Sequence, residues 1–358
     1  MRKIYSVLAL ATATALALGA CGDPDDPGTT GGNSGAPAGG GSDYKACMVS
    51  DQGGFDDRSF NQSTHDGLLA AEKDLGIEVQ ALESKDVNDF APNIETLLSA
   101  NCDLIITVGF ILAEATATAA EANPDVNFAI VDDNSITKDN VKSVVYATQE
   151  AGYLAGYAAA SYSKTGKVGT FGGMNIPTVT IFMDGYADGV ARYNTDKGKN
   201  VEVIGWNKAT QEGLFTGDFE DVAKGKTTSE TIIAQGADVI MPVAGPVGGG
   251  AAAAAKDAGN VAIVWVDADG YETTEYKEVM LTSVMKLMGE AVADIIKDAM
   301  EGKFSSDAYV GTLANGGVTI APFHDFDSSI SQETKDEIEN LKGQIVSGEL
   351  KIESPSAP

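Results

Sequence analysis

Short apolar runs alternate with segments of helical periodicity from about residue 45 onward. Runs of four to six apolar and β-branched residues are typical of parallel strands buried on both faces, and they occupy residues 45–50, 78–82, 104–108, 128–131 and 143–146. Between them, apolar residues recur every three to four positions, which predicts helices over residues 65–75, 93–100 and 112–122. This alternation predicts a βαβ series and therefore a parallel sheet.

The same alternation begins again after residue 147. It predicts helices over residues 150–164 and 179–193, and strands over residues 168–171, 201–205, 239–242, 262–266 and 279–283. Two similar series without a linker predict an α/β protein of two Rossmann-like lobes, each with a parallel sheet, joined by a hinge and suited to closing around a small ligand.

The chain is expected to cross back to the first lobe after the last of these strands. We assign lobe 1 to residues 43–147 and about 284–308, and lobe 2 to residues 148–283 and about 309–330. Residues 331–358 form a C-terminal helix and tail, because Ile338, Leu341 and Ile345 share one face of a helical segment over residues 332–347.

The first 42 residues follow a different pattern. Arg2 and Lys3 precede an apolar, alanine-rich stretch that is too short for a convincing membrane span, and small residues then lead to Cys21. This resembles a bacterial lipoprotein signal over residues 1–20, which implies that Cys21 becomes the lipidated first residue of the mature protein; an ordinary signal peptide is the alternative. Residues 21–42 lack apolar periodicity and are expected to be a flexible tether.

The chain is strongly acidic, with 24 Lys and Arg against 52 Asp and Glu and a formal net charge of −28. This charge argues against binding to nucleic acid and against electrostatic docking on anionic lipid. An acidic surface also serves solubility, so the charge says little about the ligand.

Two cysteines remain besides Cys21. Cys47 begins the first strand and Cys102 precedes the third, and these strands are usually adjacent in a doubly wound sheet, so a disulfide is geometrically allowed. Two buried free thiols are the alternative. Because no CxxC or Cys/His ligand spacing exists, we expect neither structural zinc nor another cofactor.

Polar side chains follow several predicted strands. Asp51, Asp132 and Asp267 each come directly after an apolar run, and Lys286 follows the last one. Each residue alone could be a helix cap or a surface ion-pair partner. Because open α/β sheets bind ligands at the carboxyl ends of their strands, four such residues together predict a binding site.

Catalysis is not expected. The two histidines, His65 and His324, have no partner at a spacing that would make either a base or a metal ligand. Since no acid, base or nucleophile constellation is present, the sequence predicts a binding protein that is not an enzyme.

Motifs along most of the chain are similar to those of the basic membrane protein family. They are DQGGFDDRSFN over residues 51–61, VGF over 108–110, FAIVD over 128–132, QEAGYLAG over 149–156, KTGKVG over 164–169, GGM over 172–174 and QGADVI over 235–240. The resemblance implies the type I periplasmic-binding-protein fold. It also implies an extracytoplasmic lipoprotein that captures nucleosides, with a purine base expected, for the permease and ATPase subunits of an ABC importer.

The resemblance also implies roles for individual residues in lobe 1. Phe60 is expected to stack on the base, with Asn61 and Asp51 beside it and Asp132 facing the heterocycle.

The second half of the chain supplies the remaining expected contacts. Asp267 is expected to hold the ribose hydroxyls with Lys286 beside them, and Gly245 matches the family's glycine-rich turn. Phe182 is expected to face the base from the opposite side, with Trp206 and Phe219 as alternatives.

Two departures from the family pattern leave base selectivity open: extra residues between Trp206 and Phe219, and Pro246 inside the glycine turn. A sugar or sugar-like signal is the alternative ligand, and a surface receptor or adhesin lipoprotein is the alternative role for the same fold.

Overall fold

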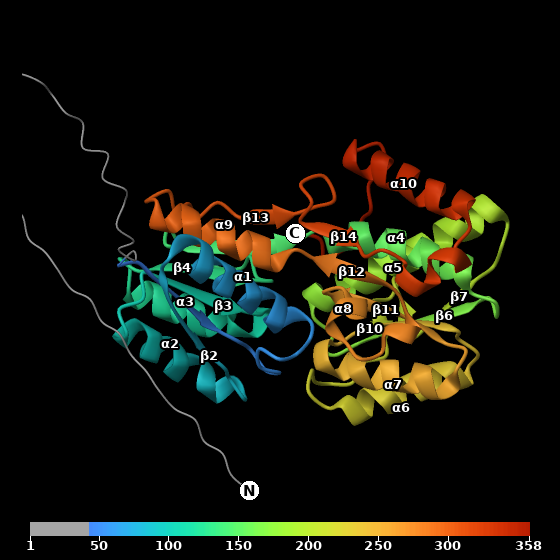
Figure 1. Ribbon diagram of the computed structural model, residues 1–358, viewed down its shortest axis with the longest axis horizontal. Helices are drawn as coiled ribbons and strands as arrows, with labels where there is room; N and C mark the ends of the chain where they lie inside the picture. Colours follow the sequence, from blue (N-terminus) through green and yellow to red (C-terminus); the bar gives the residue numbers. More distant parts are fainter. Residues whose placement is uncertain (1–42) are drawn as a thin grey trace, which may run out of the picture. The chain divides into compact units, whose positions relative to one another are not determined.

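The computed structural model describes residues 43–358 (Figure 1). The predicted signal peptide, Cys21 and the tether fall on residues 1–42 and so lie outside the described residues. Within residues 43–358, no helix is long and apolar enough to cross a membrane.

Lobe 1 is built around a six-stranded sheet in the order β13-β5-β4-β3-β1-β2, parallel throughout. Its elements are β1 (Lys45–Val49), α1 (Phe60–Leu75), β2 (Glu78–Leu82), α2 (Phe90–Ser99), β3 (Leu104–Val108), α3 (Ala113–Ala122), β4 (Asn127–Val131), β5 (Val141–Tyr146), α9 (Met288–Met300) and β13 (Tyr309–Gly311).

The strands of lobe 1 are apolar on both faces because helices cover both sides. Met48 and Ile106 pack in the cluster that includes α1 and α9, whereas their chain neighbours Cys47 and Ile105 pack with α2 and α3. This alternation follows the two-residue period of a strand.

Lobe 2 repeats the arrangement with the order β14-β12-β11-β10-β6-β7, parallel except for β14, which pairs antiparallel with β12. Its elements are α4 (Thr148–Tyr162), β6 (Lys167–Gly172), α5 (Pro177–Lys197), β7 (Glu202–Ile204), a small hairpin of β8 (Trp206–Asn207) and β9 (Glu212–Gly213), α6 (Val222–Ala234), β10 (Val239–Val243), α7 (Gly248–Ala258), β11 (Ala262–Asp267), α8 (Gly270–Thr273), β12 (Met280–Lys286) and β14 (Val318–Ile320). The predicted α/β fold class with two parallel-dominated sheets is therefore confirmed.

The chain passes between the lobes three times, after β5, after β12 and between β13 and β14. Ala147 N donates to Gly311 O at 2.8 Å and Leu287 N donates to Gly317 O at 2.9 Å, so the three crossings are bonded side by side. Because β13 pairs with β5, residues 309–311 belong to lobe 1, and the third crossing lies later than the expected boundary near residue 308.

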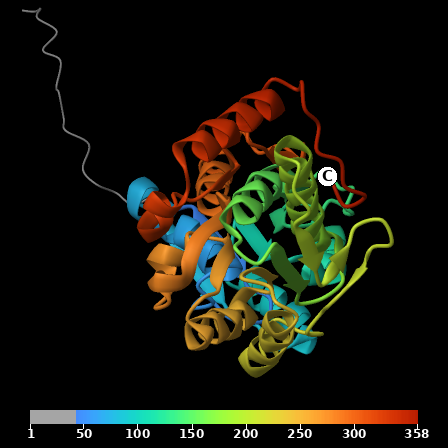
Figure 2. The same ribbon diagram turned by 90° about the vertical axis from the view of Figure 1, so that its right-hand side faces the viewer.

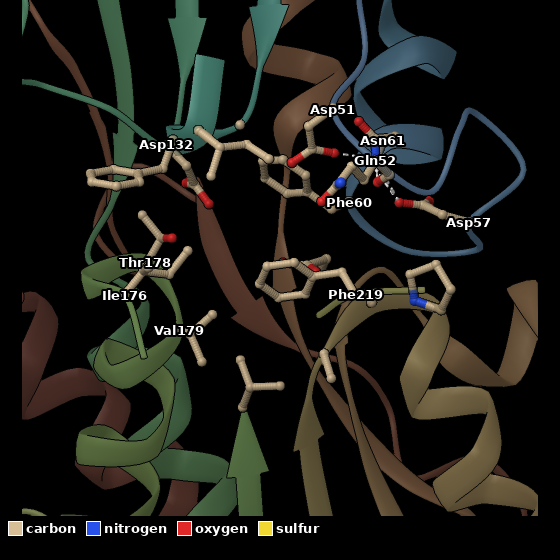
Figure 3. Close-up of a pocket in the computed structure, with 18 of the residues that line it drawn as sticks. Asp51, Gln52, Asp57, Phe60, Asn61, Asp132, Ile176, Thr178, Val179 and Phe219 are labelled. Atoms are coloured by element: carbon tan, nitrogen blue, oxygen red, sulfur yellow. Dashed lines mark hydrogen bonds between the residues drawn. The ribbon is translucent and has the colours of Figure 1, made fainter. Parts of the chain in front are cut away.

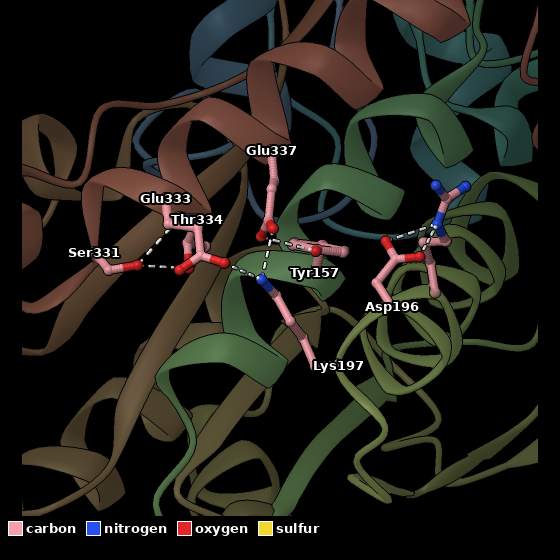
Figure 4. Close-up of polar contacts among 8 residues, drawn as sticks. Tyr157, Asp196, Lys197, Ser331, Glu333, Thr334 and Glu337 are labelled. Carbon is pink, nitrogen blue, oxygen red and sulfur yellow. Dashed lines mark hydrogen bonds and ion pairs between the residues drawn. The ribbon is translucent and has the colours of Figure 1, made fainter.

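Helix α10 (Gln332–Val346) packs against α4 of lobe 2 (Figure 2). Ile338, Leu341 and Ile345 are buried, as their shared face predicts. On the polar side, Lys197 Nζ lies 2.5 Å from Glu337 Oε1, and Tyr157 Oη donates to Glu337 Oε2 at 3.0 Å (Figure 4).

A disulfide joins Cys47 to Cys102, with 5.9 Å between their Cα atoms. It ties the middle of β1 to the turn before β3, so the two strands that carry the first site loops are covalently linked.

Candidate functional site

A cavity lies between the lobes at the carboxyl ends of both sheets, with an empty volume of about 590 Å³ that partly opens to solvent. Figure 3 shows Asp51, Phe60 and Asn61 reaching it from lobe 1, and Ile176, Val179 and Phe219 reaching it from lobe 2. All eight residues expected at the ligand line this cavity: Asp51, Phe60, Asn61, Asp132, Phe182, Gly245, Asp267 and Lys286.

The start of α1 is organised by Asp57. Its carboxylate accepts backbone N–H bonds from Ser59, Asn61 and Gln62 at 2.9, 2.8 and 3.0 Å, which satisfies donors that the first turn of a helix leaves free. This fixes where α1 begins and so directs Phe60 and Asn61 into the cavity.

The orientation of the Asn61 amide follows from its surroundings. Its Nδ2 donates to Asp51 Oδ1 at 2.7 Å, to Asp57 Oδ2 at 3.2 Å and to Gln52 O at 3.3 Å. Three acceptors around one nitrogen fix which end is the amide oxygen. That oxygen is buried and has no hydrogen-bond partner among the described residues, so it can accept a hydrogen bond from a ligand.

Asp132 and Asp267 occupy equivalent places, because β4 and β11 hold the same position in the order of their sheets. Both have a left-handed backbone, with φ of 65° and 69°, a conformation that non-glycine residues rarely adopt and that clusters at functional sites.

Lys286 connects these two carboxylates across the lobes. Its Nζ lies 2.6 Å from Asp132 Oδ2 and 3.6 Å from Asp267 Oδ1. Asp267 Oδ2 accepts the Ser59 hydroxyl of lobe 1 at 2.9 Å, while Asp267 Oδ1 has no hydrogen-bond partner among residues 43–358. This second oxygen contacts the Lys286 ammonium without a hydrogen bond, so it can still accept a hydrogen bond from a ligand.

The cavity lining carries more carboxylates than cations. Burial raises the pKa of Asp51 well above its usual range, although the hydrogen bond from Asn61 opposes the shift. Burial also raises the pKa of Asp132 against the opposing effect of Lys286. Burial by itself would lower the pKa of Lys286, but Asp132 and Asp267 outweigh it and raise that pKa, so the ammonium stays protonated.

The aromatic residues of lobe 2 differ in how much of each ring is free. Phe182 is only 1% exposed, with Lys286 Nζ 5.0 Å from its ring centroid. Phe219 keeps a partly exposed ring and packs on Gly173, where a Cβ would lie 2.3 Å from Phe219 Cε1. Trp206 lies elsewhere, buried and donating its indole N–H to Asp184 at 3.0 Å. Phe219 is therefore the aromatic residue of lobe 2 with the freer face.

Two glycines and a proline shape the cavity wall. A Cβ at Gly109 would lie 2.3 Å from Asp51 Oδ2, so only glycine leaves room for that carboxylate. Gly245 has a φ of 52° at the turn before α7. Pro246 lies against the lobe 1 loop, since a Cβ at Gly53 would be 3.3 Å from its Cγ.

Several lining residues were not singled out from the sequence: Gln52, Asp57, Gly109, Phe110, Ile111, Ile176, Thr178, Val179, Val243 and Ala244. Asp57 had a local signal, because an aspartate just before a helix start is a typical cap. The apolar members have no such signal, since an apolar residue near a strand end is usually core.

The two matched lobes and the cavity between their sheets define the class: a two-lobed binding protein of the periplasmic-binding-protein type. The chain belongs to the Bmp family, described as ABC transporter substrate-binding protein PnrA-like, which it matches over residues 44–356. The resemblance read from the motifs is therefore confirmed, and the protein is a substrate-binding protein of an ABC transporter.

Relatives share both sequence and fold. The chain is 33% identical to the ABC transporter nucleoside-binding protein BmpA of Lactococcus lactis subsp. cremoris, across 99% of both chains. It is 30% identical to basic membrane protein A of Borreliella burgdorferi, covering 87% of this chain and 88% of the relative. An ABC transporter solute-binding protein from Aeropyrum pernix K1 has a TM-score of 0.79 at 28% identity, covering 87% of this chain and 94% of that structure.

Proposed function

We propose that this protein is a lipid-anchored extracytoplasmic lipoprotein that captures a nucleoside, with a purine base expected, and delivers it to the permease and ATPase subunits of an ABC importer. The observation that carries the proposal is the combination of partly exposed aromatic rings with buried oxygens of Asn61 and Asp267 that have no hydrogen-bond partner among the described residues. A nucleoside offers the matching features, because it has a flat base with N–H donors and a sugar with hydroxyl donors. The nucleoside-binding relative from Lactococcus supports the same ligand class.

The base lies between Phe60 and Phe219, which come from opposite lobes. Stacking contributes on the order of 1 to 3 kcal/mol per base and does not depend on the sugar. Phe182, which the sequence favoured for this role, also lines the cavity, but it is only 1% exposed, whereas Phe60 and Phe219 are half-buried.

Hydrogen bonds then orient the ligand. Asn61 Oδ1, with Asp51 and Asp132 nearby, accepts from the base edge. Asp267 accepts from the ribose hydroxyls, and a charge-assisted bond of this kind is roughly twice as strong as a neutral one. Lys286 offsets the burial of the carboxylates when the lobes close.

A thermal-shift screen of the protein against nucleosides, free bases, pentoses and hexoses tests the proposal. A specific ligand stabilises the folded state by about 2.7 kcal/mol at a hundredfold excess over Kd. We expect purine nucleosides to give the largest shift. A shift with a sugar and none with any nucleoside would show that the ligand class is wrong.

A further inference from the structure

The extra residues that depart from the family pattern lie in the segment 205–221, which runs past the carboxyl end of β6. Strand β7 pairs only with residues 167–169 of β6, so the edge of β6 is free of β7 beyond that point. There Gly172 N donates to Leu214 O at 3.0 Å, and Gly172 O accepts from Thr216 N at 3.0 Å. The segment is therefore bonded to the sheet of lobe 2 at the edge where the ligand cavity lies.

Two glycines at the end of β6 make room for two aromatic rings of this segment. A Cβ at Gly172 would lie 2.7 Å from Phe215 Cδ1, and a Cβ at Gly173 would lie 2.3 Å from Phe219 Cε1. The Phe215 ring also meets the Trp206 ring edge-on, with 6.1 Å between the centroids. Phe219 lines the ligand cavity (Figure 3). Phe215 thus anchors the segment, and Phe219 presents its face to the ligand.

Asp218 fixes the turn that carries the Phe219 ring. Its Oδ1 accepts the backbone N–H groups of Glu220 and Asp221 at 3.0 and 2.8 Å. Its carbonyl oxygen accepts the Thr216 hydroxyl at 2.9 Å. These bonds hold the backbone on both sides of Phe219. Because a side chain on a fixed backbone has only a few rotamers, the ring is directed into the cavity before a ligand binds.

The other carboxylate oxygen of Asp218, Oδ2, pairs with the Lys224 ammonium. The Lys224 side chain is 50% exposed, and an ion pair with such an exposed partner contributes little. The two backbone bonds to Oδ1 are therefore the contacts by which Asp218 holds the turn.

We propose that Asp218 is a positioning residue that presets the Phe219 ring for stacking on the base, and that it acts through the backbone bonds to its Oδ1. A preset ring loses less side-chain freedom when the ligand binds, so the affinity rises without a new contact to the ligand. The stacking role of Phe219 rests on the proposed function, whereas the bonds that hold the turn do not.

A double-mutant cycle measured by calorimetry with inosine tests the positioning role. Asp218→Ala should raise Kd about tenfold, and Phe219→Ala should raise it at least as much. In the Phe219→Ala background, Asp218→Ala should change Kd less than about twofold, because no ring is left to position. The 2′,3′-dideoxy analogue of inosine should show the same pattern, because stacking does not depend on the sugar. Losses that add in the double variant would overturn the proposal, since Asp218 would then act independently of the ring.

Conservative variants separate the backbone bonds from the ion pair. Asp218→Asn keeps Oδ1 as an acceptor and loses the ion pair, so Asp218→Asn and Lys224→Gln should each stay within about threefold of the wild-type Kd. Asn207→Ala is the matched control, because Asn207 Oδ1 accepts Ala209 N at 3.0 Å in the hairpin at the other end of the same segment. It should leave Kd unchanged. The proposal would be wrong if Asp218→Asn or Asn207→Ala lost as much affinity as Asp218→Ala.

Hydrogen exchange followed by NMR tests the preset turn without a ligand. Asp218→Ala should accelerate exchange of the Glu220 and Asp221 amides about tenfold, because both lose their acceptor. Asp218→Asn and Asn207→Ala should leave these two amides as they are in the wild type. Unchanged exchange in Asp218→Ala would overturn the positioning role. A failure of every nucleoside to bind would refute the proposed function, and the exchange of these two amides would still support or overturn the preset turn.

Discussion

At the scale of single residues, the site depends on how buried charges are balanced. Lys286 is 4% exposed and contacts one carboxylate from each lobe, Asp132 and Asp267. Removing one member of such a group leaves an uncompensated buried charge, which is strongly destabilising. The lysine is therefore both a ligand-site residue and a contact that holds the lobes together.

Asp267 allows the sugar contact to be separated from the base contact. Asp267→Ala should weaken a ribonucleoside by about tenfold or more, since a charge-assisted bond is lost. It should affect the 2′,3′-dideoxy analogue far less, because that analogue lacks both of the neighbouring ribose hydroxyls. Calorimetry measures the loss of affinity for each of the two ligands. The substitution also removes the bond between Asp267 and Ser59, but this affects both ligands equally and so cancels when the two losses are compared.

Two variants control this comparison. Phe60→Ala should weaken both ligands by a similar factor, because stacking is independent of the sugar. Ser59→Ala removes the inter-lobe bond but keeps the carboxylate, and should also affect both ligands alike. Equal losses for both ligands in Asp267→Ala would assign this aspartate a purely structural role.

Asp51 predicts how stability depends on pH. Burial raises its pKa in the folded state above the unfolded value, so the unfolded chain loses this proton at lower pH than the folded protein. Between those two pKa values, stability falls as pH rises. Asp51→Asn removes this loss and should make the protein about 1 kcal/mol more stable at pH 7, with little change below pH ~4.

Urea unfolding of Asp51→Asn across this pH range measures the effect. Asp125→Asn changes an exposed aspartate and should follow the wild-type profile. An Asp51→Asn profile parallel to wild type would contradict the raised pKa. The same variant should weaken nucleoside binding, since the base edge loses a strong acceptor.

At the scale of elements, the strand-to-helix connections decide which side chains line the cavity. The loop from β1 to α1 carries Asp51, α1 begins with Phe60 and Asn61, and Asp57 organises this junction through three backbone bonds. The disulfide Cys47–Cys102 joins the middle of this loop's strand to the segment before β3. The two strands are thus covalently linked, while the loops at their carboxyl ends line the cavity.

Loss of the disulfide should destabilise the fold without abolishing the site. The two cysteines are 55 residues apart, and a loop of this length contributes about 2 to 4 kcal/mol. The double variant Cys47→Ala and Cys102→Ala should lose this amount in urea unfolding, with nucleoside affinity changed less than about threefold at 25 °C, because both cysteines lie away from the cavity lining. Dithiothreitol should destabilise the wild type but not the variant; a wild type insensitive to reduction would contradict the bond.

At the scale of the whole described chain, contacts across the cleft place the two lobes in a closed arrangement. Ser59 bonds to Asp267, and the Trp265 indole donates to Arg58 O at 3.3 Å. These bonds must break for a ligand to enter between the lobes. Ligand capture therefore requires the two lobes to open and close about the hinge.

Small-angle scattering should detect this closure. Without ligand, the inter-lobe bonds alone should leave a fraction of molecules open, so a saturating purine nucleoside should lower the radius of gyration by about 1 Å. Asp267→Ala lacks one of these contacts and should show a larger radius before ligand is added. Identical radii with and without ligand would contradict a hinge that closes on the nucleoside.

The sequence alone determined the elements and the edge of the sheets where the site forms. Apolar runs and helical periodicity are local signals. A strand that is buried on both faces has the same apolar pattern whichever strands lie next to it in the sheet. Asp51, Asp132 and Asp267 could be grouped from their positions in the sequence, because parallel strands bring their carboxyl ends to one edge. In the folded chain all three line one cavity.

Only the tertiary structure decided matters that depend on contacts between distant residues. Phe182 and Phe219 are both aromatic residues of lobe 2 that line the cavity, and their exposed fractions distinguish them: Phe182 is 1% exposed, whereas Phe219 is half-buried. Likewise, β13 belongs to lobe 1 because it pairs with β5, although it precedes β14 of lobe 2 by a few residues. The periodicity of apolar residues indicates which local segments form helices or strands. The exposure of a side chain and the pairing of a strand depend instead on residues that are distant in the sequence, so the local pattern does not predict them.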